Sequence, residues 1–330
     1  MGETMATTER LDVELEGRLR RFLAPRVPTV PGDEGDILAG FPDSDTLVTK
    51  FHEVWGRIEE HLDVNLTSEE ALKLFPSLLI YDIPDGTRST LSVRRDVDVG
   101  LDASLYLLAL IHTLRGLGAR RTALMTHTAY NRERGKEGLG RIFAVIAKGM
   151  RVAQRYTAAG HINVRWIGMK PDYELRSALL ESFPLQAKPS FEAFLLIDYV
   201  EELLEDEALR EQLEDLPDVD VCIRHTKLNL SGGGWIPGKM LHSAFLYSQN
   251  GSLFTNWSFD ELVAMSTVAL LAKLFNSGEG LVKMYGDLDE VKARYQLREL
   301  RLFNARIQLR PRPTKLFLFG SPVGLYQVYY

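Results

Sequence analysis

The chain has 330 residues, of which 45% are hydrophobic, and it carries a formal net charge of −6 at pH 7. This length and apolar content suffice for a sizeable core, and the negative charge gives no general attraction for nucleic acid, so we expect no nucleic-acid partner. The single cysteine, Cys222, excludes an internal disulfide and a cysteine-rich metal cluster, and its apolar neighbours predict an ordinary buried thiol.

No segment of the chain predicts a membrane anchor. The first 20 residues are charged and lack the apolar stretch of a secretion signal. The longest apolar stretches, near residues 105–110 and 263–274, are shorter than the roughly 20 residues that span a bilayer. We therefore expect a cytoplasmic protein with at most peripheral membrane contact.

The N-terminal part of the chain predicts a helical extension over residues 1–75. Helical periodicity covers residues 8–23 and 45–62, and the proline-rich segment 25–32 between them cannot continue a helix. Thr67, followed by two glutamates, is typical of the start of a further short helix, because its side chain and the acidic first turn satisfy free amides.

Residues 76–330 predict one α/β domain, because short apolar runs alternate with amphipathic stretches. Such runs, separated by helices, are typical of a parallel sheet that is covered on both faces. The predicted strands are 78–81, 123–125, 164–167, 191–197, 219–223 and 244–247. The predicted helices are 99–117, 138–158, 172–182, 199–213 and 259–275. The fold class is therefore α/β, with a central, mostly parallel sheet of about six strands flanked by helices, and with an extra C-terminal hairpin at 316–320 and 323–330.

Polar groups follow three of these strands, at the edge where parallel sheets bind ligands. Each group has two interpretations. The segment after the first strand is a catalytic turn or a simple Pro-Asp-Gly turn. The segment after the second is an anion site or a capped helix with solvated arginines. The segment after the fifth, with its glycine run, is a phosphate cradle or a flexible polar loop. The segments are Pro84-Asp85-Gly86-Thr87-Arg88, Thr128 to Arg134, and Arg224 to Lys227 followed by Ser231-Gly232-Gly233-Gly234.

The order of these segments resembles the motif series of the cis-prenyltransferase family, to which undecaprenyl diphosphate synthases belong. Asp-Gly follows the first strand, Thr-x-x-Asn-x-x-Arg follows the second, and Ile-Arg-x-Thr precedes an aromatic segment with Trp257. The resemblance covers residues 77–265, and it includes 164–168, which is similar to the family's Ile-Arg-Phe-Ile-Gly-Asp strand. It implies the family's fold, a homodimer, and a transferase of isoprenoid biosynthesis that acts on an allylic prenyl diphosphate.

The resemblance also implies roles for individual residues. Asp85 matches the aspartate that holds Mg²⁺ and assists departure of the diphosphate. Thr128 and Asn131 match groups that position and deprotonate the condensing carbon. The implied diphosphate-binding residues are Gly86, Thr87, Arg88, Arg134 and Arg224. The family's second arginine in the late motif is missing here, and we expect Lys227 or, alternatively, Lys239 to replace its positive charge.

The chain departs from the family pattern mainly on the isopentenyl side. The first motif lacks its Asn and Trp, and Arg88 lies one place early. The late motif has no Glu and no second Arg, and residues 243–252, where the family places its second metal ligand, contain no carboxylate. Met169 stands where the family has an aspartate.

Because the retained positions lie on the allylic side, we predict an enzyme that ionises an allylic diphosphate and gives an irregularly coupled or cyclised terpene. Apolar residues at helical spacing are more often core than cavity, and only the resemblance makes two helices candidate walls of a product tunnel. In that interpretation the bulky residues Tyr106, His112 and Phe143 favour a C10–C20 substrate. The alternatives are a chain-extending synthase that uses isopentenyl diphosphate, a non-catalytic partner subunit of one, and a diphosphate-binding protein without catalysis.

Overall fold

We describe the chain from a computed structural model. It describes residues 40–62, 64, 66–84, 99–130, 143, 146, 152–171, 173, 175–199, 205–225, 234–249, 257–276, 305–321 and 324–330.

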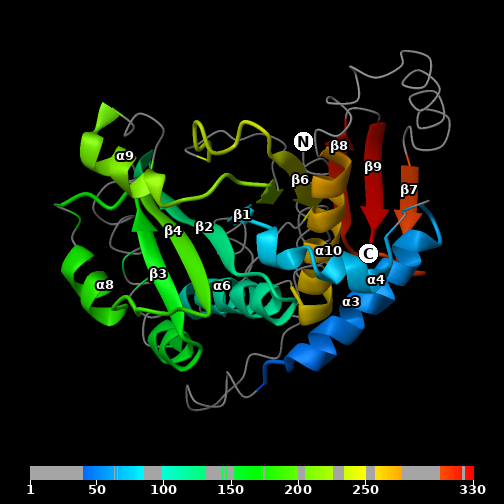
Figure 1. Cartoon of the computed structure of the whole chain (residues 1–330), viewed down its shortest axis with the longest axis horizontal. Helices are drawn as coiled ribbons and strands as arrows, with labels where there is room; N and C mark the ends of the chain where they lie inside the picture. The colour runs from blue at the N-terminus through cyan, green and yellow to red at the C-terminus, as the bar shows by residue number, and fades with distance from the viewer. Residues whose placement is uncertain are drawn as a thin grey trace, which may run out of the picture.

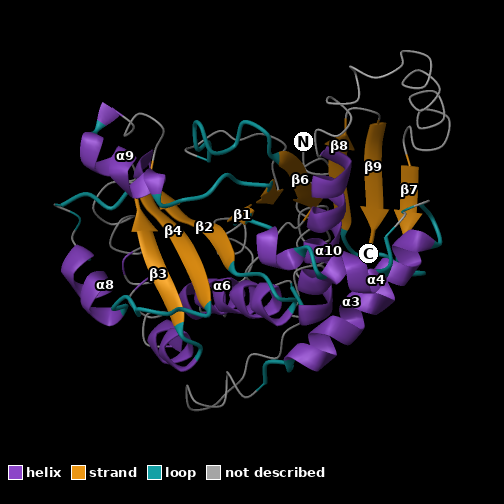
Figure 2. Ribbon diagram, viewed as in Figure 1, coloured by secondary structure: helices purple, strands orange, loops and turns teal. Residues whose placement is uncertain are grey.

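Six parallel strands form the centre of the molecule (Figures 1 and 2). They are β1 (Ile80–Ile83), β2 (Arg121–Thr128), β3 (Ile162–Ile167), β4 (Phe191–Tyr199), β5 (Val221–His225) and β6 (Ala244–Gln249). Their order in the sheet is β3-β4-β2-β1-β5-β6, and each pair of neighbours is parallel. The predicted α/β class with about six mostly parallel strands is therefore confirmed.

Within the described residues, three C-terminal strands extend this sheet to nine strands. The strand β8 (Leu316–Ser321) pairs antiparallel with β6 and with β9 (Gly324–Tyr329), so the two C-terminal segments form a hairpin. The strand β7 (Ala305–Gln308), which the sequence pattern did not predict, lies parallel to β9 at the far edge. It was missed because it is short and only Ile307 in it is buried.

Two long helices, α6 (Val99–Gly116) and α10 (Phe259–Asn276), pack on one face of the sheet together with α3 (Ser44–Glu59). Every residue of α10 from Glu261 to Ala272 is buried, which is typical of a helix with neighbours on all sides. The short helices α8 (Arg176–Ser182) and α9 (Glu207–Glu214) lie near β3 and β4, where their apolar residues pack in smaller clusters (Figure 1).

Local signals fix where several helices begin. Asp43 caps α3, because its side chain accepts from the Thr46 amide at 2.8 Å. The short helix α4 (Ser68–Leu72) begins with a capping box in which the Thr67 hydroxyl and the Glu70 carboxylate satisfy each other's backbone amides. A single 3₁₀ turn (Phe75–Ser77) then leads into the first strand.

Several predicted bounds need correction. The helix predicted at 199–213 begins at Glu207 among the described residues, because β4 continues through Tyr199, which pairs with Thr128 and is buried. The helix predicted at 172–182 begins at Arg176, and the strand predicted at 123–125 is longer in both directions. The helix predicted at 8–23 lies outside the described residues, and the division of the chain at residue 75 stays a prediction.

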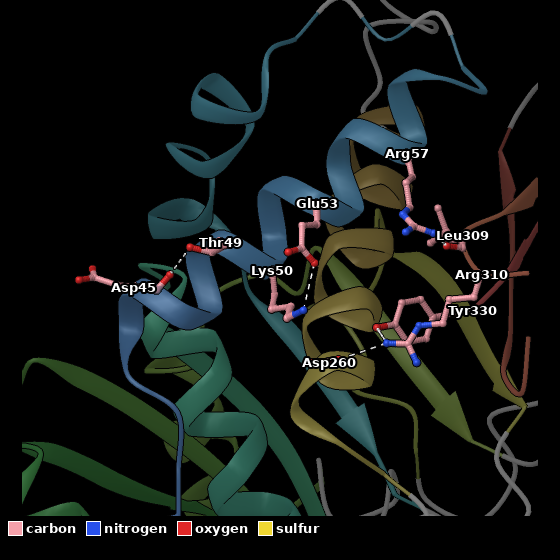
Figure 3. A network of polar contacts seen from close by, with 9 residues as sticks. All are labelled: Asp45, Thr49, Lys50, Glu53, Arg57, Asp260, Leu309, Arg310 and Tyr330. Atoms are coloured by element: carbon pink, nitrogen blue, oxygen red, sulfur yellow. Dashed lines mark hydrogen bonds and ion pairs between the residues drawn. The ribbon is translucent and has the colours of Figure 1, made fainter.

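Polar contacts, drawn in Figure 3, fasten the C-terminal segment to α3 and α10. Arg57, near the end of α3, donates to the carbonyl oxygen of Leu309. Arg310 donates to Asp260 Oδ2 of α10 at 3.2 Å and also to the hydroxyl of Tyr330. The guanidinium of Arg310 lies 3.9 Å from the centroid of the Tyr330 ring, a cation–π contact.

In the part of the chain that the structure describes, no helix is long and apolar enough to cross a membrane.

Candidate active site at the carboxyl edge of the sheet

The three strands that lead into the family-like motifs are neighbours in the sheet. The strand β1 lies between β2 and β5 and is parallel to both, so the carboxyl ends of all three meet at one edge. Neighbouring strands lie about 4.8 Å apart, which places the ends of β2 and β5 about 10 Å from each other. An edge of this kind, where polar loops follow parallel strands, is the usual ligand site of an α/β sheet.

Two of the predicted site residues lie within the described part of the chain, and both are at this edge. Thr128 is the last residue of β2 and is partly buried. Arg224 is the last but one residue of β5, is 4% exposed, and stands in register with Ile83, the last residue of β1. The remaining predicted site residues lie outside the described residues: Asp85, Gly86, Thr87, Arg88, Asn131, Arg134 and Lys227.

The first of these residues follows β1 closely in the sequence. Ile83 ends β1, and Pro84 is the last described residue before Asp85. The structure therefore brings Thr128 and Arg224 to the two sides of the strand that leads into Asp85.

The neighbouring ends of β3 and β4 carry features that the sequence analysis missed. Asp198 in β4 is 0% exposed and has a φ of 54°, a left-handed conformation that is uncommon outside glycine. Gly168, directly after β3, has a φ of 90°, and a Cβ built there would lie 2.7 Å from the carbonyl oxygen of Ile197. Only glycine permits this close approach, so the loop after β3 stays against the end of β4.

A buried polar trio joins β1, β5 and α6 just inside the edge. Asp82 in β1, Tyr106 in α6 and His225 in β5 each have 0% exposure. Asp82 Oδ1 lies 2.7 Å from His225 Nε2, and Asp82 Oδ2 accepts from the Tyr106 hydroxyl at 2.9 Å. The Tyr106 oxygen also lies 3.4 Å from His225 Nε2.

The chemistry of the trio follows from its donors and acceptors. Burial, followed by the charge of Asp82 and its hydrogen bond, raises the pKa of the Tyr106 hydroxyl well above its ordinary value, so Tyr106 stays protonated and donates. We assign the Nε2 hydrogen of His225 to the bond with Asp82, because both carboxylate oxygens then accept one hydrogen each. In the neutral ring this leaves Nδ1 as an acceptor, and that buried atom has no partner among the described residues.

A small cavity of about 20 Å³ lies beside the trio. Such a volume is enough for one water molecule. Its polar lining comes from several elements, namely Tyr106 of α6, His225 of β5, Ser248 of β6, Glu261 of α10 and Lys315, which precedes β8. The cavity therefore adjoins groups from both the parallel strands and the C-terminal hairpin.

Neither Asp82 nor a separate role for His225 was predicted from the sequence. Chemistry was expected after the strand ends, whereas Asp82 lies within a strand whose four residues are all buried. A signal was available, because an aspartate inside an otherwise apolar run has to find a partner in the core.

The residues predicted to line a product tunnel make ordinary core contacts. Tyr106 belongs to the trio. His112 lies 2.9 Å from the Tyr156 hydroxyl and 2.6 Å from the carbonyl oxygen of Pro42, and Phe143 packs edge-on against Tyr173. These contacts do not test the predicted substrate length.

Groups for a metal or a thiol nucleophile are not assembled in the described residues. No cluster of three or more histidine, cysteine, aspartate or glutamate side chains with metal-binding geometry occurs among them, so the Mg²⁺ prediction depends on Asp85. Cys222 is 1% exposed, and burial raises the pKa of its thiol, as expected for an inert buried cysteine.

Comparison with known proteins gives structural matches only. No family model matches the chain, and no curated protein matches it. Lavandulyl diphosphate synthase from Lavandula x intermedia, solved in complex with dimethylallyl diphosphate, is similar with a TM-score of 0.48 and 18% identity, over 59% of this chain and 94% of that one. A probable undecaprenyl diphosphate synthase from Campylobacter jejuni is similar with a TM-score of 0.40 and 14% identity, over 58% of this chain and 93% of that one.

Proposed function

We propose that the chain is a prenyl diphosphate-processing enzyme that ionises an allylic diphosphate of C10–C20 and releases diphosphate, giving an irregularly coupled or cyclised terpene. The observation that carries this proposal is the strand order β2-β1-β5. It supports a single site, because three motifs that are far apart in the sequence follow strands that are neighbours in the sheet. Had these strands been separated, the motif order would have had no chemical meaning.

In the proposed reaction the bond between the allylic carbon and the diphosphate oxygen breaks, and both bonding electrons leave with diphosphate. Negative charge then concentrates on the departing group, and an arginine at the strand ends stabilises it. Arg224 is suited to this role, because its guanidinium is held almost fully buried next to the end of β1. Arg134 and Lys227 are proposed as further cations of the same site.

The allylic cation that remains needs apolar, electron-rich surroundings until it reacts. Two aromatic side chains near the carboxyl edge are partly exposed, Tyr130 after β2 (39%) and Trp235 (38%). Trp235 is held near the end of β4, because its carbonyl oxygen accepts from the Tyr199 hydroxyl at 3.0 Å. Aromatic faces stabilise cations, so we propose that these rings shield the allylic cation.

We propose Mg²⁺ as the cofactor, with Asp85 as its protein ligand. Magnesium commonly keeps several waters and binds through one or two carboxylates together with phosphate oxygens, so one aspartate is a sufficient protein contribution. When bound, the ion neutralises charge on the departing diphosphate. A homodimer in the cytoplasm is part of the same proposal.

The test is to incubate the purified protein with Mg²⁺ and dimethylallyl, geranyl, farnesyl or geranylgeranyl diphosphate, each with and without isopentenyl diphosphate, and to identify products by mass spectrometry. We expect a product from an allylic substrate alone. A product that requires isopentenyl diphosphate would make the protein a chain-extending synthase. Binding without any product would favour a partner subunit or a diphosphate-binding protein.

Asp85→Ala is the matching variant. We expect turnover to fall about 10²-fold or more, because a group that acts on the developing charge is removed, while the melting temperature stays unchanged. Asp45→Ala, an exposed aspartate in the first turn of α3, is the control and should keep full turnover. Full activity in Asp85→Ala would contradict the mechanism.

A further inference from the structure

The polar trio lies where it can fix the geometry of the candidate site without touching a substrate. Asp82 is followed in β1 by Ile83 only, and His225 is the last residue of β5. Register pairs Asp82 with Ile223 and Ile83 with Arg224. The link between Asp82 and His225 therefore joins the last but one residue of β1 to the last residue of β5, close to where the chain enters the motif segments.

Arg224, the proposed diphosphate ligand, and His225, a member of the trio, lie on opposite faces of the sheet. Successive side chains of a strand point to opposite faces of the sheet, so Arg224 and His225 face opposite ways. Ile223, which shares the face of His225, packs in the cluster that includes α6 and α10, whereas Cys222, on the face of Arg224, packs in the cluster that includes α9. His225 therefore acts on Arg224 only through the backbone that they share.

The contacts of the trio leave little freedom to the strand ends. Asp82 accepts two hydrogen bonds of 2.7 and 2.9 Å from groups on two other elements, and all three side chains are excluded from water. Loss of one of these donors would leave a buried carboxylate short of a partner and lower the stability of the fold. The two strands and α6 are therefore held at fixed distances from one another. Weak β-ladder bonds at the end of a strand do not achieve this by themselves.

We propose that Asp82, Tyr106 and His225 form a positioning network that fixes the carboxyl ends of β1 and β5, and with them Arg224, for the binding of a diphosphate group. The inference rests on the proposed function for the nature of the ligand. The network itself is an arrangement of the strand ends and is tested separately from that ligand.

The first test compares Tyr106→Phe with Tyr156→Phe by amide hydrogen exchange. Both changes remove only a hydroxyl from a buried tyrosine that contacts a histidine, but Tyr156 pairs with His112 and not with the trio. We expect peptides that cover the ends of β1 and β5 to exchange roughly tenfold faster in Tyr106→Phe, because a hydrogen bond to a buried charged group is lost there. Tyr156→Phe should leave these peptides unchanged.

The second test measures binding of inorganic diphosphate, in the presence of Mg²⁺, by calorimetry. A displacement of about 1 Å in a positioned group is enough to lose orders of magnitude in function, so we expect roughly tenfold weaker binding in Tyr106→Phe and wild-type binding in Tyr156→Phe. His225→Gln, as a second variant of the network, should weaken binding in the same direction.

The outcomes separate the two proposals. Equal exchange at the strand ends in Tyr106→Phe and Tyr156→Phe overturns the positioning network, whatever the protein binds. Unchanged diphosphate affinity in both Tyr106→Phe and His225→Gln also overturns it. A wild-type protein that binds no diphosphate overturns the proposed function instead, and the exchange experiment then still decides whether the trio fixes the strand ends.

Discussion

Helix α6 takes part in two tyrosine–histidine contacts, one fully buried and one partly buried. Tyr106 lies near His225 and shares Asp82 with it, whereas His112 lies near Tyr156 and contacts the carbonyl oxygen of Pro42. A carbonyl only accepts, so the second histidine directs its Nε2 hydrogen to Pro42 and receives the tyrosine hydrogen on Nδ1.

The difference between the two contacts is a fully buried carboxylate. In the second contact, desolvation, as the largest cause, lowers the pKa of His112, burial raises the pKa of Tyr156 to about 12, and the nearby Arg115 guanidinium acts on both groups. The first contact contains a carboxylate with no access to water. A contact at a partly exposed site is modest in its effect on stability, while a fully buried charge makes every one of its partners important. Substitutions in the two contacts should therefore lower the free energy of unfolding by unequal amounts.

The largest effect is expected for Asp82→Asn. The change removes the charge and one acceptor from the trio and leaves Tyr106 and His225 buried with a poorer partner, which we expect to reduce the free energy of unfolding by about 3 kcal/mol or more. Urea denaturation measures this change. Glu53→Gln, which alters an exposed ion pair with Lys50 on α3, is the control and should stay within about 0.5 kcal/mol of the wild type. Similar stabilities of the two variants would contradict the assignment of Asp82 as a buried carboxylate that accepts from both Tyr106 and His225.

An intermediate effect is expected when the two tyrosine hydroxyls are removed in turn. Tyr106→Phe takes a donor from a fully buried carboxylate and should cost about 2 kcal/mol, whereas Tyr156→Phe takes a donor from the His112 ring at a partly exposed site beside Arg115 and should cost about 1 kcal/mol. Urea denaturation of both variants gives the ranking. An equal or reversed order would show that the carboxylate does not distinguish the two contacts.

The smallest effect is a dependence of stability on pH that comes from His112. The folded protein holds this histidine with a lowered pKa, so the unfolded chain binds its proton first as the pH falls. The contribution of His112 to stability is therefore fully present above its ordinary pKa of about 6.5 and is lost as the pH falls below it. Urea denaturation between pH 7.5 and 5 should show a shallower decline in His112→Asn than in the wild type. An identical decline would contradict a neutral His112.

The sequence was sufficient for the central part of the fold. Apolar runs and helical periodicity predicted β1 to β6, α6 and α10 within a few residues, because the helices are long and the strands are mostly buried, apolar runs. The motif order directed attention to the carboxyl edge, where Thr128 and Arg224 do lie.

The partners of Asp82 were out of reach of the same reasoning. Its contacts come from residues 24 and 143 positions away, and no local pattern encodes a pairing of that separation. The strand order that brings β5 next to β1 had to be known first. Asp198 was missed for a different reason, since an aspartate only modestly raises the expectation of a left-handed conformation and a strand position lowers it.

The burial of α10 has a consequence for the synthesis of the protein. This helix, apolar on all sides, packs against α3 and α6, which precede it in the chain, and against β8, which follows it. Until residues 316–321 leave the ribosome, one side of α10 has no cover, and a nascent chain with such a surface is prone to aggregate. Expression should accordingly be sensitive to changes that delay formation of the C-terminal hairpin, even though that hairpin lies on the opposite side of β6 from β5 and the candidate site.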